Sequence, residues 1–118
     1  MNTAHCSLFA LPGIPDVQPG DDVGRLLLAA LDRAGLAPQD GDVLAVAQKI
    51  ISKAEGRLVD LAEVEPGERA RELGRQTDKD PRLVELILRE SDEVSRVRPG
   101  VIIVRHRLGF TSANAGID

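Results

Sequence analysis

A run of consecutive apolar residues, Val43–Ala47, constrains the fold more than any other stretch of the sequence. The run is too short for a helix, and continuous hydrophobicity is typical of a central strand that is buried on both faces. The stretch 49–54 follows it directly and predicts a short helix or turn. Because open α/β sheets bind ligands beyond the carboxyl ends of their strands, this junction is a first candidate for a binding site.

Helical spacing is clearest between Asp21 and Gly35. Asp21 and Asp22 offer N-caps, and Gly35 stands where a left-handed residue commonly ends a helix. Apolar residues recur three and four positions apart between them, which is the pattern of a helix with one buried face. The predicted apolar face consists of Val23, Leu26, Leu27, Ala30, Leu31 and Ala34.

Two more helices are predicted in the second half of the chain. The first begins at Pro66-Gly67-Glu68 and runs to about Gln76, with Pro66 near the first helical position. The second begins at Asp80-Pro81, which combines an N-cap with a proline at the first helical position, and runs to about Ser91.

Strands are expected at both ends of the chain. A first short strand is predicted at Ser7–Ala10, and three more at 94–97, 101–104 and 110–113. Pro99-Gly100 and Leu108-Gly109 supply the turns between the last three. The predicted class is therefore mixed α/β (α+β), with a small mixed sheet, about three helices and a C-terminal β-meander.

The composition limits both the core and the partners. A chain of 118 residues suffices for one domain, 1–118, with a modest core. Because Phe9 and Phe110 are its only aromatic residues, the core must be aliphatic, and base stacking on aromatic rings is disfavoured. The net charge of −4 likewise disfavours a nucleic-acid partner.

Cellular location is read from cysteine usage and apolar runs. Cys6 is the only cysteine, so the sequence offers no intrachain disulfide and no thiolate metal cluster. The first residues lack the pattern of a signal peptide, and the longest apolar run, Leu26–Leu31, is too short to span a membrane. We therefore expect a cytoplasmic protein without a membrane partner.

A second polar segment follows the last predicted strand. Residues 111–118 end on Asn114-Ala115-Gly116-Ile117-Asp118, in which Gly116 would allow a positive φ. The lysines Lys49 and Lys53 in one segment and Asp118 in the other suit a phosphate group with its bound metal ion. The alternative reading is that the lysines are solvated surface residues and that the aspartate caps its own turn.

These segments carry a resemblance to a known family. Residues 42–56, with Gly13-Ile14-Pro15 before them and residues 114–118 after them, resemble coenzyme F420-0:L-glutamate ligases, and the likeness extends through 80–85 and 88–91. The resemblance implies GTP-dependent formation of an amide bond between L-glutamate and the deazaflavin cofactor F420-0 or its dehydro precursor, by way of an acyl phosphate. It also implies a homodimer in the full-length form.

The resemblance assigns roles to individual residues. Asp118 falls on a metal-binding aspartate, which implies Mg²⁺ or Mn²⁺, with K⁺ as a further candidate ion. No residue is assigned a catalytic role. The positions that would line the nucleotide are Pro15, Asp16, Val17, Gln18, Gln48, Lys49 and Lys53. The loop at 15–18 could equally be an ordinary proline-containing connection, and no P-loop motif is present.

The histidines offer no metal site of their own. His5 and His106 lack zinc-ligand spacing, and His106 is expected to lie exposed in the basic string 105–107, a candidate for attracting an acidic substrate. Family members continue past residue 118, so we expect a truncated ligase domain with little or no activity alone. A non-catalytic nucleotide- or cofactor-binding module and a structural module of the same fold remain as alternatives.

Overall fold

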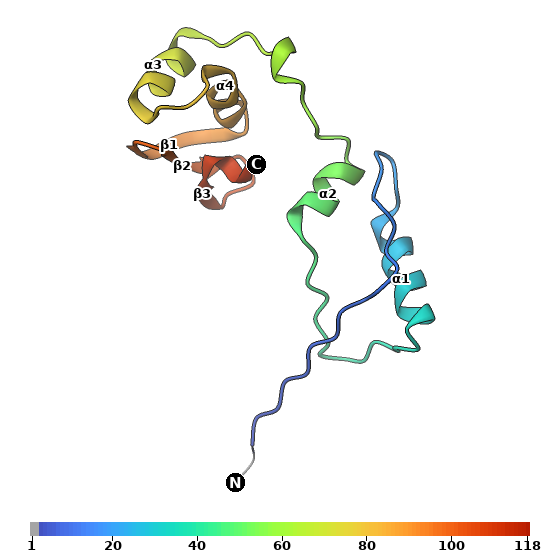
Figure 1. Ribbon diagram of the computed structural model, residues 1–118. Coiled ribbons are helices and arrows are strands. Elements are labelled where there is room, and N and C mark those ends of the chain that lie inside the picture. Colours follow the sequence, from blue (N-terminus) through green and yellow to red (C-terminus); the bar gives the residue numbers. More distant parts are fainter. Residues whose placement is uncertain (1–2) are drawn as a thin grey trace. The chain divides into compact units, whose positions relative to one another are not determined.

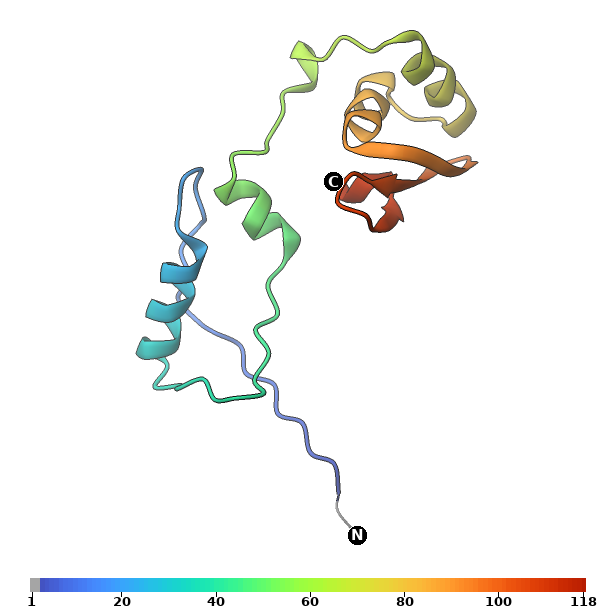
Figure 2. The same cartoon turned by 180° about the vertical axis from the view of Figure 1, so that it is seen from behind.

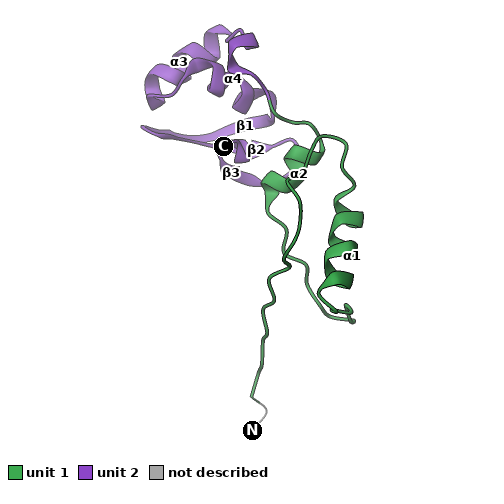
Figure 3. Cartoon of the chain, turned by 45° about the vertical axis from the view of Figure 1, so that its right-hand side comes forward, with its two compact units in different colours: residues 1–58 green, residues 59–118 purple. Residues whose placement is uncertain are grey.

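Four α-helices and three β-strands form in residues 3–118, the part of the chain that the computed structural model describes. They divide between two compact units, residues up to Leu58 and residues from Val59 onward, which Figure 3 distinguishes by colour. The mixed α/β class predicted from the sequence is confirmed. None of the described helices is long and apolar enough to cross a membrane.

The first helix of unit 1, α1 (Val23–Arg33), forms as predicted (Figure 1). The Asp22 side chain caps it by accepting the backbone N–H of Arg25 at 3.0 Å. On the predicted apolar face Ala30 and Leu31 are buried, whereas Leu28, which lies off that face, is 65% exposed. The helical period therefore identified the buried side correctly.

Two glycines end the helices of unit 1 in the same way. After α1, Gly35 has a φ of +66°, its N–H bonds to Asp32 O, and the Leu36 N–H bonds to Leu31 O. These two hydrogen bonds define a Schellman motif, as the placement of Gly35 predicted. The second helix, α2 (Gln48–Ala54), ends likewise at Gly56, which also has a φ of +66°.

The two strands predicted in unit 1 are absent. Ser7–Ala10 and Val43–Ala47 belong to no helix or strand, and Val43 is 88% exposed. The expectation of a buried central strand was wrong for a physical reason: a strand needs a neighbour that accepts and donates its backbone hydrogen bonds. A hydrophobic run reveals the tendency to be buried but not the segment that would pair with it.

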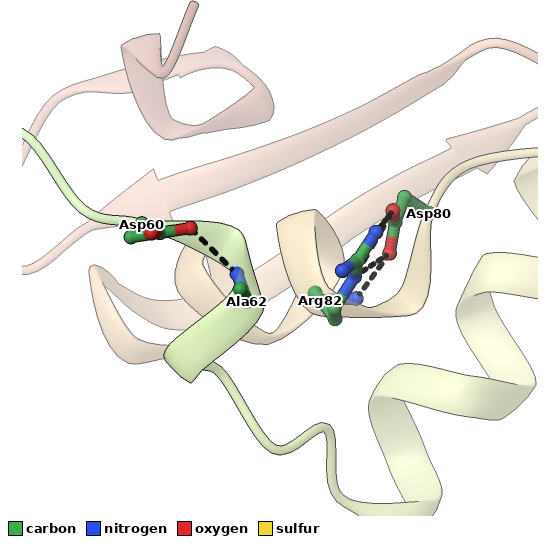
Figure 4. Close-up of polar contacts among 4 residues, drawn as sticks. All are labelled: Asp60, Ala62, Asp80 and Arg82. Carbon is green, nitrogen blue, oxygen red and sulfur yellow. Dashed lines mark hydrogen bonds and ion pairs between the residues drawn. The ribbon is translucent and has the colours of Figure 1, made fainter.

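The helices of unit 2 follow their predicted capping signals closely. Asp80 caps α4 (Pro81–Arg89) by accepting the N–H of Arg82 at 2.9 Å, with Pro81 in the first turn (Figure 4). The other helix, α3 (Glu68–Thr77), begins two positions after Pro66, which was expected near its first position, because Gly67 is the N-cap.

The sheet of unit 2 is the predicted β-meander. Its strands β1 (Ser91–Arg98), β2 (Val101–His106) and β3 (Thr111–Ala113) pair in that order and are antiparallel throughout. The sheet is therefore not the mixed sheet that was expected, since the two strands predicted in unit 1 do not join it. Two irregularities in the β1–β2 register, between Ser91 and Glu93 and between Val94 and Arg96, interrupt the regular pairing.

The core of unit 2 lies between this sheet and its helices. Both α3 and α4 pack on one face of the sheet, as Figures 1 and 2 show from opposite sides. Every buried member of the core is aliphatic, as the scarcity of aromatic residues predicted. The cluster consists of Ala70, Val84, Ile87, Ile102, Val104 and Ala115.

Candidate functional site

Unit 1 brings two of the predicted nucleotide-binding residues into contact. Lys53, in the last turn of α2, forms an ion pair with Asp16 in the loop that precedes α1. The Asp16 side chain is 77% exposed and that of Lys53 is 29% exposed, so the pair lies at the surface. No feature of the sequence predicted this pairing, because the two residues are 37 positions apart.

Backbone and side-chain bonds hold the loop against α2. Gln18 Nε2 donates to the Asp16 carboxylate at 3.2 Å, and the Gln18 N–H donates to Asp21 at 2.7 Å. The Gly20 N–H donates to the carbonyl of Ala54, at the end of α2, at 2.8 Å. The loop and the helix end are thereby one structural element, and Asp16 is positioned from both sides.

The electrostatics favour a charged carboxylate in this loop. The hydrogen bond from Lys53 and the charge of its ammonium, in that order, lower the pKa of Asp16, and the bond from Gln18 adds a smaller effect. Lys53 therefore already has an anionic partner. An ammonium has three donor hydrogens, so Lys53 could contact a phosphate oxygen while keeping Asp16, or exchange one anion for the other.

The remaining predicted nucleotide-binding residues lie in the same unit. Gln48 and Lys49 are in the first turn of α2, and Lys49 stands four positions before Lys53, so both lysines lie on one side of the helix. Pro15 is exposed, whereas Val17 is only 4% exposed. Val17 therefore has a structural role whatever the loop binds.

The predicted metal ligand, Asp118, follows an unusual turn in unit 2. The 3₁₀-helix η2 (Asn114–Gly116) has positive φ angles at all three positions: 53° at Asn114, 56° at Ala115 and 74° at Gly116. The positive φ expected of Gly116 is confirmed. Positive φ at two successive non-glycine residues is strained, and it persists only where the surroundings enforce it.

The enforcing contacts come from the sheet and the core. Asn114 Oδ1 accepts the backbone N–H of Ile102 at 3.3 Å, and the Ala115 methyl group is buried in the core with 4% exposure. The Ile117 N–H closes the turn on Asn114 O at 3.0 Å. The turn that carries the exposed Asp118 is thus attached to β2 and to the core.

The donor set at Asp118 suits only certain metals. No group of three or more His, Cys, Asp or Glu side chains suitable for a metal occurs among residues 3–118. A single carboxylate fits Mg²⁺ or Mn²⁺, because such ions commonly take most of their ligands from phosphates and water. Asp118 belongs to unit 2 and Lys53 to unit 1, and their convergence on one ligand stays a prediction.

His106 departs from its expected position. It lies at the end of β2 with 8% exposure, and its ring stacks on Phe110 with centroids 4.5 Å apart. Nδ1 accepts the N–H of Leu108 at 3.0 Å, and Nε2 lies 3.2 Å from Glu90. The prediction of an exposed loop histidine was wrong, because a following turn can fold back over the end of a strand.

The flanking arginines of the basic string stay exposed but are paired. Arg105 lies 3.4 Å from Glu93, and Arg107 lies 3.1 Å from Glu90. Attraction of an acidic substrate to this string stays a prediction, and these carboxylates would compete with it.

Comparison with known proteins places these segments in context. A sequence profile described as F420-0:Gamma-glutamyl ligase matches residues 13–118, which include both the Asp16–Lys53 pair and the turn before Asp118. Several proteins named coenzyme F420:L-glutamate ligase are similar over most of the chain. That from Methanothermobacter thermautotrophicus is 45% identical over 112 residues, which cover 95% of this chain and 44% of the relative.

Two further relatives carry the same name. The protein from Methanopyrus kandleri is 46% identical over 102 residues, which cover 86% of this chain and 38% of the relative. The protein from Haloarcula marismortui is 40% identical over 117 residues, with 94% and 43% covered. The chain thus spans less than half the length of these relatives, to which it is similar over nearly its own whole length. It belongs to the F420-0:gamma-glutamyl ligase family.

Proposed function

We propose that this chain contributes the N-terminal part of a GTP-dependent ligase that joins L-glutamate to coenzyme F420-0 or its dehydro precursor. A carboxylate oxygen of the acceptor attacks the γ-phosphorus of GTP, and the bond to the β-phosphate oxygen breaks to release GDP. The glutamate amine then attacks the acyl phosphate, loses a proton, and expels inorganic phosphate as the amide forms. Family membership and the names of the relatives support the joining of L-glutamate to coenzyme F420. The use of GTP and the acyl phosphate are part of the proposal.

The observation that carries the proposal is the Asp16–Lys53 pair at the junction of the loop and α2. Reactions at phosphorus depend mainly on positioning and on neutralising charge at the transferred group. Lys53 supplies the cation, and Asp16 holds its flexible side chain in place before the nucleotide arrives. Gln18 and Lys49 complete the polar lining along the same loop and helix.

The metal is assigned to Asp118. When bound, Mg²⁺ or Mn²⁺ neutralises the phosphate oxygens and orients them for displacement. The role of this chain is to hold the carboxylate in place, and the turn at 114–116 does so through its bond to Ile102 and its buried methyl group.

A completed chain tests the proposal. Residues 1–118 joined to the remaining sequence of the Methanothermobacter relative should form GDP only when glutamate and the acceptor are both present. Lys53→Ala and Asp118→Ala should each lower that rate at least about a hundredfold, as expected for loss of a charge-neutralising group. Arg25→Ala, on an exposed part of α1, is the matched control and should leave the rate unchanged.

The same protein separates the alternatives. GTP binding without glutamate-dependent GDP formation would indicate a binding module. An unchanged melting temperature with GTP and Mn²⁺ would indicate a structural module, because a ligand specific to the native state must stabilise it. Near-normal turnover in both variants would refute the assigned site.

A further inference from the structure

A second group of cations, unrelated to the residues above, lines a shallow hollow in unit 2. The hollow has a volume of about 300 Å³, at the lower end of the range for small-molecule sites, and lies where α3 meets the connection to α4. It is lined by Arg71, Gly74, Arg75, Lys79 and Pro81. Three of these five side chains are cationic, and none is acidic.

The floor of the hollow is built by a close backbone approach. Gly74 is buried, and a methyl group placed on it would lie 3.0 Å from the Lys79 carbonyl oxygen and 3.4 Å from the Cα of Pro81. The Lys79 N–H also bonds to Gly74 O at 3.0 Å. Glycine at this position lets the connection lie directly on the helix, which brings Lys79 beside Arg75.

The charges at the hollow are only partly neutralised. Arg71 is held by Glu65 at 2.6 Å and by the Pro66 carbonyl at 3.1 Å, but Arg75 and Lys79 make no ion pair with any residue in the described part of the chain. The partial charge at the C-terminal end of α3, about half a negative elementary charge, offsets only part of two full positive charges.

Two carboxylates flank Lys79 in sequence: Asp78 forms no ion pair among the described residues, and Asp80 is engaged by another residue. Both oxygens of Asp80 accept hydrogen bonds from Arg82, at 2.6 Å for the closest pair, as Figure 4 shows. This pairing lowers the pKa of Asp80 to about 2, chiefly through the Arg82 side-chain bond. Asp80 therefore stays charged and bound to Arg82, and it leaves Lys79 available to another anion.

We propose that this hollow binds a small oxyanion, a carboxylate or phosphate group, between Arg75 and Lys79. Arginine and lysine together offer both a planar fork and a compact charge to such a group. The proposal uses none of the residues assigned to the nucleotide or the metal, so it stands or fails separately from the ligase function.

Backbone NMR of the intact 118-residue chain tests the site. Sodium phosphate and L-glutamate are titrated in separate arms at constant ionic strength. Saturable shifts of the Gly74 and Lys79 amides are expected, and the arm with the lower dissociation constant distinguishes a phosphate site from a carboxylate site. Arg75→Gln and Lys79→Gln should each weaken binding at least about tenfold, since a charge-assisted hydrogen bond contributes roughly 1.5–3 kcal/mol and about 1.4 kcal/mol corresponds to tenfold.

Arg69→Gln is the matched control, because Arg69 is an exposed arginine of the same helix that does not line the hollow. It should bind as the unsubstituted chain does. Shifts that never saturate in either arm, or equal weakening by Arg69→Gln, would show only general attraction to positive charge and would overturn the proposal. Two independent variants keep the test decisive if one of them fails to fold.

Discussion

The two units of this chain bury their apolar residues to very different extents. Unit 2 has a three-stranded sheet covered by two helices and a contiguous aliphatic core. Unit 1 has two helices, no strand among its described residues, and a short list of buried side chains: Val17, Ala30 and Leu31. Its exposed large hydrophobic residues are Leu8, Phe9, Leu28, Val43, Leu44, Ile51 and Leu58.

The difference shows that burial of apolar residues in this chain depends on pairing between segments that are neighbours in sequence. Each strand of unit 2 pairs with its neighbour along the chain, so the meander completes itself within a short segment. The apolar stretches of unit 1, Ser7–Ala10 and Val43–Ala47, have no such neighbour in sequence. Within the family, more than half of each relative's length lies outside the region that this chain matches.

Hydrogen exchange would show the largest contrast. The Ile102 and Val104 amides, in the central strand β2, should exchange roughly a thousandfold or more slowly than those of residues 43–46, which belong to no helix or strand. Mass spectrometry or NMR on the intact chain measures both regions at once. Strong protection of residues 43–46 would mean that this segment is paired in solution and would break the comparison.

Core truncation should destabilise the chain selectively. Ile87→Ala removes a side chain with 0% exposure between α4 and the sheet, and it should lower the free energy of unfolding by about 2–5 kcal/mol. Leu28→Ala truncates a side chain that is 65% exposed, and it should change the free energy of unfolding by less than about 0.5 kcal/mol. Urea denaturation measures both, and similar losses would contradict the burial described for α1.

A pair of glycine substitutions compares the helices. In unit 2, Gly74→Ala forces a methyl group to within 3.0 Å of a backbone carbonyl, and overpacking of this kind costs about 1–3 kcal/mol. In unit 1, Gly24→Ala meets only Asp22 Oδ1, the oxygen that caps α1, at 3.3 Å, so this side chain must give by a few tenths of an ångström. It should change stability by less than about 1 kcal/mol, with the higher helix propensity of alanine in its favour. Equal melting temperatures for the two variants would argue against the close approach at Gly74.

Acid should weaken unit 2 through Asp80. Its pKa is lowered from 3.8 to about 2 in the folded chain, so its charge stabilises the fold above about pH 4, and this contribution is lost as the pH falls toward 2. Asp80→Asn keeps a capping side chain but has no titrating group. Melting temperatures measured between pH 2 and pH 5 should therefore fall less steeply for the variant. Parallel curves would show that the Asp80–Arg82 pair contributes nothing to the acid response.

Capping signals were the most reliable guide to local structure. Asp22, Gly35 and Asp80 each act where they were expected to act, because a cap depends on a few adjacent residues and their own backbone hydrogen bonds. Pro66 shows the limit of such signals, since it precedes the N-cap of α3 by one residue. Strand predictions succeeded only where the pairing partner was the next segment along the chain.

For the candidate site, too, the sequence indicated the residues but not their partners. The residue types were identified from polar segments beyond apolar runs and from the resemblance to a family. The pairing of Asp16 with Lys53, the burial of His106 against Phe110, and the attachment of Asn114 to Ile102 had no signal in the sequence. Each of these three contacts joins a side chain to a partner that the hydrophobic periodicity of the sequence does not specify.

The sequence by itself predicted three of the four helices with their ends to within about two residues, the aliphatic character of the core and the family. These follow from periodicity, capping and composition, which act over a few residues or over the whole chain at once. Only the tertiary structure decided that Val43 and Leu44 lie exposed, that His106 is buried, and which anions neutralise which cations. The physical reason is that burial and ion pairing depend on residues brought together by folding, and their positions along the chain do not specify one another.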